Sequence, residues 1–259
     1  MTAEAPTKAS DANAFGRPLT PSEHRRTPAR RTLPFEDRPE AEFKEGIDAL
    51  TLLLTDPRQC DLQQALHALY QTELGGLDVF GRALVHASDW AKEQEQEQGR
   101  SAEDIVPWGF ELAYARILWD EVRHSELARA IAHNHDIHLG DFVDGFRRDG
   151  IQESPLSMDP AITSASINSG GEGMAMNLFS ALISMAQELE DADMEVAFDF
   201  NHADEMMHVS VGDHWVPRLT ENDPERRKAA LMAQRAFEDN VIAMQNGEHV
   251  PGSNIHMAF

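Results

Sequence analysis

Cysteine is almost absent from this chain, which has only Cys60 in 259 residues. An intramolecular disulfide is therefore excluded, and such scarcity is typical of proteins from a reducing compartment, so we expect a cytoplasmic location. The sequence also lacks an apolar run of about 18 residues, the length that a membrane-spanning helix needs. Its beginning lacks the apolar core of a signal peptide. We therefore expect no membrane association.

Positive charge is scarce as well, because 22 Lys and Arg stand against 45 Asp and Glu, for a net charge of -23. Phosphate contacts need clustered Lys and Arg, so we expect no nucleic-acid partner. The local exception is the basic segment 17–31, within residues 1–40. That region is rich in Pro, Thr, Arg and Ala without an apolar period, which predicts an extended or disordered arm. The arm could wrap its own domain, wrap the sister subunit of a homodimer, or be a free tail.

Tyrosine is rare and no strand-like alternation stands out, whereas helix formers dominate. We therefore predict an all-α domain over residues 41–259, with a bundle core at about 60–217. Helical apolar spacing and cap residues predict four bundle helices, an additional helix before them and another after them. Their expected ranges are 42–54, 61 to about 87, 107–133, 169–187, 194–216 and 223–245. The polar stretch 88–104 is expected to be either a frayed helix end or a loop, and the spacing of Glu73 and Glu121 favours a loop. Residues 134–165 are expected to form a long crossover between the second and third bundle helices.

Two short sequences have the same form, Glu-x-x-His. One pairs Glu121 with His124, and the other pairs Glu205 with His208. Residues three apart share a helix face, so each pair can offer a carboxylate and an imidazole to one ion. Two single glutamates, Glu73 and Glu172, fall on the inward faces of the other two bundle helices. An antiparallel corner at the acidic run 188–193 would bring Glu172 and Glu205 to the same height.

Four such helices make the di-metal carboxylate site of a helix bundle. We assign two ligand sets, in which Glu121 and Glu205 also bridge the ions. The first set is Glu73, Glu121 and His124, and the second is Glu172, Glu205 and His208. Carboxylate with imidazole suits iron or manganese better than structural zinc.

Neighbouring residues leave alternatives open. His202 lies one helical turn before Glu205, and is either an additional ligand or a residue outside the site. Asp120 and Asp204 each precede a ligand glutamate, and either orient the histidine of the opposite metal or are solvated. The glycines beside Glu73 and Glu172 make room for dioxygen or substrate, or allow close helix packing.

The chain resembles the ferritin-like di-iron carboxylate proteins. More narrowly, Glu172-Gly-Met-Ala-Met176 and the run from Asp204 to Trp215 resemble a bacterial ferritin-like family without an assigned function. The resemblance covers roughly residues 60–216. It implies a ferritin-like four-helix bundle that binds two iron ions, or mixed manganese and iron, and activates dioxygen.

From these observations we expect an oxygen-activating non-haem di-iron oxidoreductase. It would hydroxylate, N-oxygenate or desaturate a small-molecule substrate, with electrons from an external donor. Two other functions fit the sequence. One is a ferritin-type metal oxidase or storage protein, and the other is a non-enzymatic helical binding protein.

Overall fold

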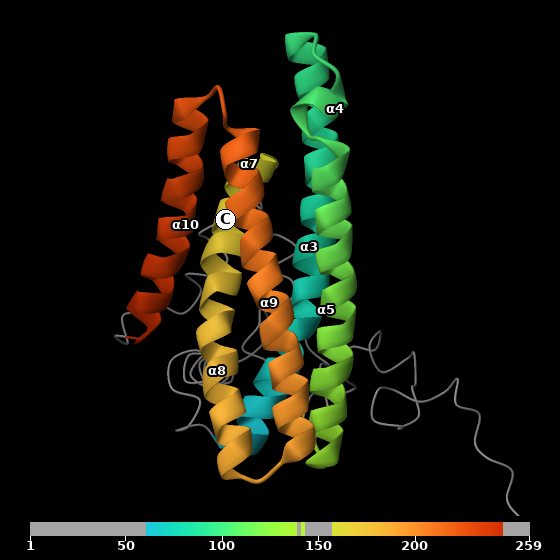
Figure 1. Ribbon diagram of the computed structural model, residues 1–259, viewed down its shortest axis with the longest axis vertical. Coiled ribbons are helices and arrows are strands. Elements are labelled where there is room, and N and C mark those ends of the chain that lie inside the picture. The colour runs from blue at the N-terminus through green and yellow to red at the C-terminus, as the bar shows by residue number, and fades with distance from the viewer. Residues whose placement is uncertain (1–60, 139–140, 143–156, 246–259) are drawn as a thin grey trace, which may run out of the picture.

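The computed structural model describes residues 61–138, 141–142 and 157–245, and every regular element in these ranges is a helix (Figure 1). The expected all-α class is confirmed for this part of the chain. The predicted arm at 1–40, the helix at 42–54, much of the crossover and the C-terminal tail lie outside the described residues. None of the described helices is both long enough and apolar enough to cross a membrane.

Two helical hairpins lie side by side and contact each other chiefly through α5 and α9 (Figure 1). The first consists of α3 (Leu62–Gln98), the short α4 (Ala102–Ile105) and α5 (Trp108–Asn134). The second consists of α7 (Pro160–Ser164), the π-helix η4 (Ala165–Glu172), α8 (Gly173–Glu188) and α9 (Ala192–Leu219). A last helix, α10 (Pro224–Gln245), packs against η4 and α7.

Local sequence explains where most helices begin and end. Asp61 starts α3 by accepting hydrogen bonds from the backbone N–H groups of Gln63 and Gln64, and Gly99 ends it in the left-handed conformation at φ 69°. Asp191 caps α9 in the same way as Asp61 caps α3, so the predicted corner in the acidic run is confirmed. The predicted start of α10 at Asp223-Pro224 is also confirmed, because Asp223 accepts from the N–H of Arg226.

Two large apolar clusters fill the interior, one toward each end of the hairpins, and a third, small one joins α10 to α7, η4 and α9. On α3 the buried members of the first cluster end at Tyr70 and those of the second begin at Phe80. On α5 the buried members of the second cluster end at Ile117 and those of the first resume at Ala128. Glu73, Glu121 and His124 fall in these intervals, so the polar residues of interest lie between two water-excluding layers.

Of the two alternatives for the polar stretch 88–104, the structure has the helix end. The stretch does not loop out, because α3 continues to Gln98 and α4 follows. Ala87 and Ala91 are buried in the second apolar cluster against Ile105 and Val106. The glutamates and glutamines around them are simply the solvated face of a helix whose other face is packed.

Two predicted boundaries are wrong. The third bundle helix was expected to begin near Ser169, but helical structure begins at Pro160 and passes through η4 first. Asp159 caps this start by accepting from the N–H of Ala161 at 2.8 Å. The fourth was expected to stop before Pro217, yet α9 runs to Leu219 with that proline in its last turn.

Candidate metal centre

The six side chains singled out from the sequence converge in the interior, from four helical segments. Ligand atoms of Glu121, Glu172, Glu205 and His208 lie within 4.8 Å of one another, and those of Glu73, Glu121 and His124 form a second such group. Glu121 belongs to both groups. These groups of buried carboxylates and imidazoles can hold a metal ion.

The two imidazoles face the same carboxylates. Nδ1 of His124 lies 3.3 Å from Glu205 Oε1, 3.4 Å from Glu73 Oε2 and 3.8 Å from Glu121 Oε1. Nδ1 of His208 lies 2.9 Å from Glu205 Oε2 and 3.5 Å from Glu121 Oε1. Glu121 and Glu205 thus lie between the two imidazoles, where the sequence analysis expected bridging carboxylates.

Burial dominates the electrostatics of this cluster. Five of the six residues are at most 5% exposed, and only Glu172 is partly exposed. Burial raises the pKa of Glu73 and Glu172, and raises the pKa of Glu121 to about 8. Burial acts on Glu205 in the same direction, but its contacts with the two imidazoles lower its pKa to about 2.

The pKa values of both imidazoles are raised, against the effect of burial. Burial alone would lower the pKa of His208, but Asp120 and Glu205 beside it raise it to about 9. The pKa of His124 is likewise well above its ordinary value, because Asp204, Glu205 and Glu73 outweigh burial. In the metal-free protein, protons therefore neutralise the negative charge that a cation would otherwise neutralise.

Two buried atoms at the centre support a fit to metal. Glu121 Oε1 and His124 Nδ1 are buried and find no hydrogen-bond partner with good geometry among the described residues. Leaving such an atom unsatisfied costs about 1–3 kcal/mol. A cation ligated by both atoms would remove that cost, and this mixture of carboxylate and imidazole suits iron or manganese.

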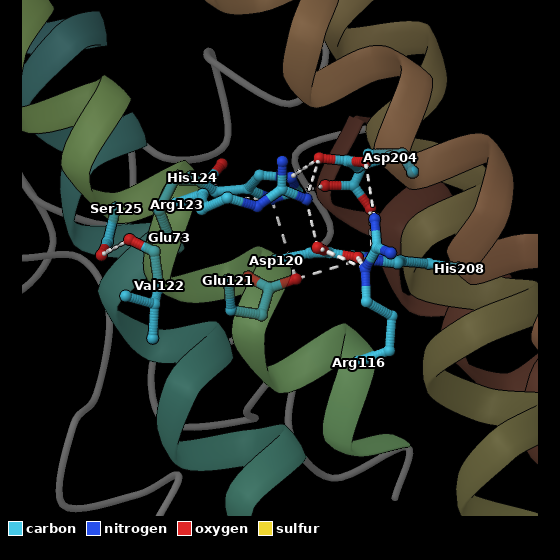
Figure 2. Close-up of polar contacts among 11 residues, drawn as sticks. Glu73, Arg116, Asp120, Glu121, Val122, Arg123, His124, Ser125, Asp204 and His208 are labelled. Atoms are coloured by element: carbon cyan, nitrogen blue, oxygen red, sulfur yellow. Dashed lines mark hydrogen bonds and ion pairs between the residues drawn. The ribbon is translucent and has the colours of Figure 1, made fainter. Parts of the chain in front are cut away.

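Two aspartates hold the outer side of the imidazoles (Figure 2). Nε2 of His124 lies 3.3 Å from Asp204 Oδ2, and Nε2 of His208 lies 3.6 Å from Asp120 Oδ2. Each aspartate therefore serves the histidine of the opposite helix, as one of the two alternatives expected. At His124 the contact is a hydrogen bond that favours a proton on Nε2. At His208 the 3.6 Å separation is longer than a hydrogen bond, and Nδ1 instead lies 2.9 Å from Glu205 Oε2.

His202 lies outside both groups. Its Nε2 is 3.3 Å from the hydroxyl of Ser180 on α8, on the surface of the second hairpin. The contact with Ser180 places His202 on the side of α9 that faces α8. The expectation of an additional ligand at this position therefore finds no support in the geometry.

The glycines have several roles. A Cβ atom at Gly76 would overlap the carboxylate of Glu121, so this glycine makes room for a cluster residue. At Gly171 a Cβ would lie 3.5 Å from the ring of Phe237 on α10, which is ordinary packing. At Gly173 a Cβ would meet no atom of the described residues within 4 Å, so this position beside Glu172 is open.

Sequence reasoning missed several residues around the cluster. Arg116 and Arg123 contact the two aspartates, and only the position of Arg123 directly before His124 could have drawn attention to it. It also missed Tyr114, whose hydroxyl donates to Asn168 Oδ1 of η4 at 2.7 Å. Both residues are fully buried, and Asn168 lies about one helical turn before Glu172 on η4.

Comparison with known proteins gives no relative from which a function could be transferred. No protein-family model matches the chain, and neither a curated protein nor a solved structure matches it.

Proposed function

We propose that the chain is an oxygen-activating non-haem di-iron oxidoreductase with a ferritin-like bundle, acting on a small molecule with an external electron donor. One observation carries the proposal. Two Asp-Glu-x-x-His runs on α5 and α9 meet with Glu73 and Glu172 in a buried cluster between two apolar layers. The runs are arranged about an approximate twofold axis, because each aspartate contacts the histidine of the other run.

The proposed ligands fall into two sets. One ion would be held by Glu73, Glu121 and His124, and the other by Glu172, Glu205 and His208, with Glu121 and Glu205 shared. Four carboxylates would balance two divalent cations. When bound, two iron ions, or manganese with iron, would supply the redox capacity to reduce dioxygen.

The protein's own residues would prepare the site. The apolar layers around Phe80 and Phe179 exclude water, which strengthens the electrostatic interactions inside. Asp120 and Asp204 hold the imidazoles with Nδ1 inward. Glu172 is the only partly exposed member, and the open position at Gly173 lies beside it, so a small molecule would approach from this side.

The first experiment measures metal content together with the optical spectrum after the iron(II)-loaded protein is exposed to oxygen. We expect two iron ions per chain and a spectral change that accompanies oxygen consumption. A purified protein that takes up no transition metal would exclude the proposal. Iron oxidation in a cage-sized assembly, without turnover of any small molecule, would instead favour a ferritin-type function.

A further inference from the structure

The two Asp-Glu-x-x-His runs differ at their two middle positions, and one of these differences is a charge. In Asp120-Glu-Val-Arg-His124 an arginine precedes the histidine, whereas in Asp204-Glu-Met-Met-His208 a methionine stands there. We propose that Arg123 is a positioning residue that serves both halves of the centre, because it holds both aspartates and through them orients both imidazoles. The inference rests on the proposed function, since it concerns the same metal centre.

The contacts converge on one nitrogen atom (Figure 2). Nη2 of Arg123 donates to Asp120 Oδ1, and also to Asp204 Oδ2 at 2.9 Å. The same Asp204 Oδ2 faces Nε2 of His124 at 3.3 Å. The other oxygen of Asp120, Oδ2, lies 3.6 Å from Nε2 of His208, which is an ion-pair contact longer than a hydrogen bond. Two chains of contacts, one to each imidazole, therefore begin at a single guanidinium group.

Burial makes these contacts stronger than ordinary surface ion pairs. The side chain of Asp120 is 0% exposed, that of Asp204 is 15% exposed and that of Arg123 is 26% exposed. Hydrogen bonds between ionised partners are strong, and water screens them poorly at such sites. The guanidinium also lies 5.1 Å from the ring centroid of Phe200, which helps to fix it over α9.

Arg116 provides a matched comparison in the same network. Its Nε donates to both oxygens of Asp120, at 2.8 and 2.9 Å, but its nearest approach to Asp204 is 4.0 Å. Its side chain is 57% exposed, so water competes for the guanidinium. Arg116 thus supports the half of the centre that contains His208, whereas Arg123 supports both halves.

The consequence for metal binding follows from the role of the aspartates. Without Arg123, Asp204 loses its closest arginine and Asp120 keeps only Arg116, so both aspartates are held less firmly and orient their histidines less well. Loss of such an outer partner typically costs about 10–100-fold in metal affinity. Removal of Arg123 should therefore weaken two sites at once, although Arg123 is not itself a ligand.

The test uses cobalt(II) as the probe in the full chain, titrated without oxygen into the wild type, Arg123→Met and Arg116→Met. In Arg123→Met we expect both binding steps to weaken by about tenfold or more. We also expect both metal-shifted imidazole N–H signals in the proton NMR spectrum to broaden or disappear. In Arg116→Met one binding step and the N–H signal of His124 should remain as in the wild type. A purely structural role for Arg123 would not remove both N–H signals from folded protein.

The outcomes separate this inference from the proposed function. Unchanged affinity and intact N–H signals in Arg123→Met overturn the inference while the metal centre stands, and so does equal weakening of both steps in Arg116→Met. A wild type that takes up no cobalt removes the proposed function itself. If Arg123→Met does not fold, Arg123→Lys carries the test. We expect this lysine variant to weaken both cobalt-binding steps. Weakening of only one step, or of neither, overturns the inference.

Discussion

At the scale of single residues, Gly76 shows how closely the cluster is packed. A Cβ atom there would overlap Glu121 Oε2 and lie 2.9 Å from Glu121 Cδ. We expect Gly76→Ala to push this carboxylate away from both imidazoles and to lower the affinity for both metal ions by about tenfold or more. Metal titration of the variant measures the effect.

The control for this prediction is Gly81→Ala, five residues further along the same helix. A Cβ at Gly81 would meet only Leu118 Cδ1 among the described residues, at 4.0 Å. Alanine favours helix by about 1 kcal/mol over glycine, so we expect unchanged metal affinity and a slightly higher melting temperature. If Gly76→Ala binds metal as tightly as Gly81→Ala does, the room at Gly76 has no bearing on the centre.

A second residue-scale prediction concerns the proposed ligands. Glu205→Ala and His208→Ala should each abolish binding of one metal ion without unfolding the helices, because both residues hold the ion bound with Glu172 while the apolar layers remain intact. Metal content after loading and helical circular dichroism measure the two effects. His202→Ala serves as the control and should still bind two ions. Two ions retained in both ligand variants would contradict the assignment.

At the scale of residues, the sequence predicted the glutamates and histidines of the two Glu-x-x-His pairs, because their three-residue spacing occurs twice. The three-residue spacing of Glu121 and His124 follows from helix geometry alone, so it is visible without any structure. The roles of Gly76 and Arg123 depend on contacts across helices, with Glu121 and Asp204, and no local pattern encodes such contacts. The sequence shows that Gly76 lies close to Glu73, but it does not show that this glycine contacts Glu121 on another helix.

At the scale of the elements, the π-helix η4 carries Glu172 at its end. Such helices are rare and often occur at functional sites. The hydroxyls of Tyr114 on α5 and Ser164 on α7 both donate to Asn168 Oδ1, at 2.7 and 3.2 Å. On the other side Gly212 of α9 packs so closely that a Cβ there would lie 2.6 Å from Ser169 Oγ. The segment is thus held between α5 of the first hairpin and α9 of its own hairpin.

The variant Tyr114→Phe tests how much the hydrogen bond from Tyr114 to Asn168 stabilises η4. The ring remains packed on Phe110 and Phe80, at centroid distances of 4.4 and 6.0 Å, so the variant removes only the hydroxyl. We expect the free energy of unfolding to fall by about 1 kcal/mol, since one buried hydrogen bond is lost. We also expect the metal ion held by Glu172 to be released more readily than the other. Denaturant unfolding and metal titration measure both effects, and no change in either would contradict a role for this hydrogen bond.

The sequence predicted the elements better than their boundaries. Long apolar periods identified the helices that carry the six residues, because each has one face packed against a partner. The start of the α7–η4–α8 segment was missed because Ser164, Ser166 and Asn168 are poor helix formers locally. Their helical conformation depends on tertiary contacts such as that of Asn168 with Tyr114.

At the scale of the whole molecule, the cluster links stability to pH. The pKa of Glu121 is raised from 4.5 to about 8, and that of His208 from 6.5 to about 9. A group whose pKa is higher in the folded form stabilises that form while protonated, and the stabilisation disappears as the pH rises through the folded value. Glu205, with a pKa of about 2, affects stability only in acid.

The melting temperature of the metal-free protein should therefore fall between pH 6 and pH 9, the interval in which Glu121 and His208 lose their protons. Metal ions bind the deprotonated ligands, so metal affinity should rise over the same interval and the stabilisation by metal should grow. Thermal unfolding at several pH values, with and without metal, measures both trends. Glu121→Gln is the control, because it removes one titrating group and should flatten the metal-free curve. A metal-free melting temperature that rises toward pH 9 would show that these buried acids and imidazoles are not protonated together, and that the cluster is not poised to exchange protons for a cation.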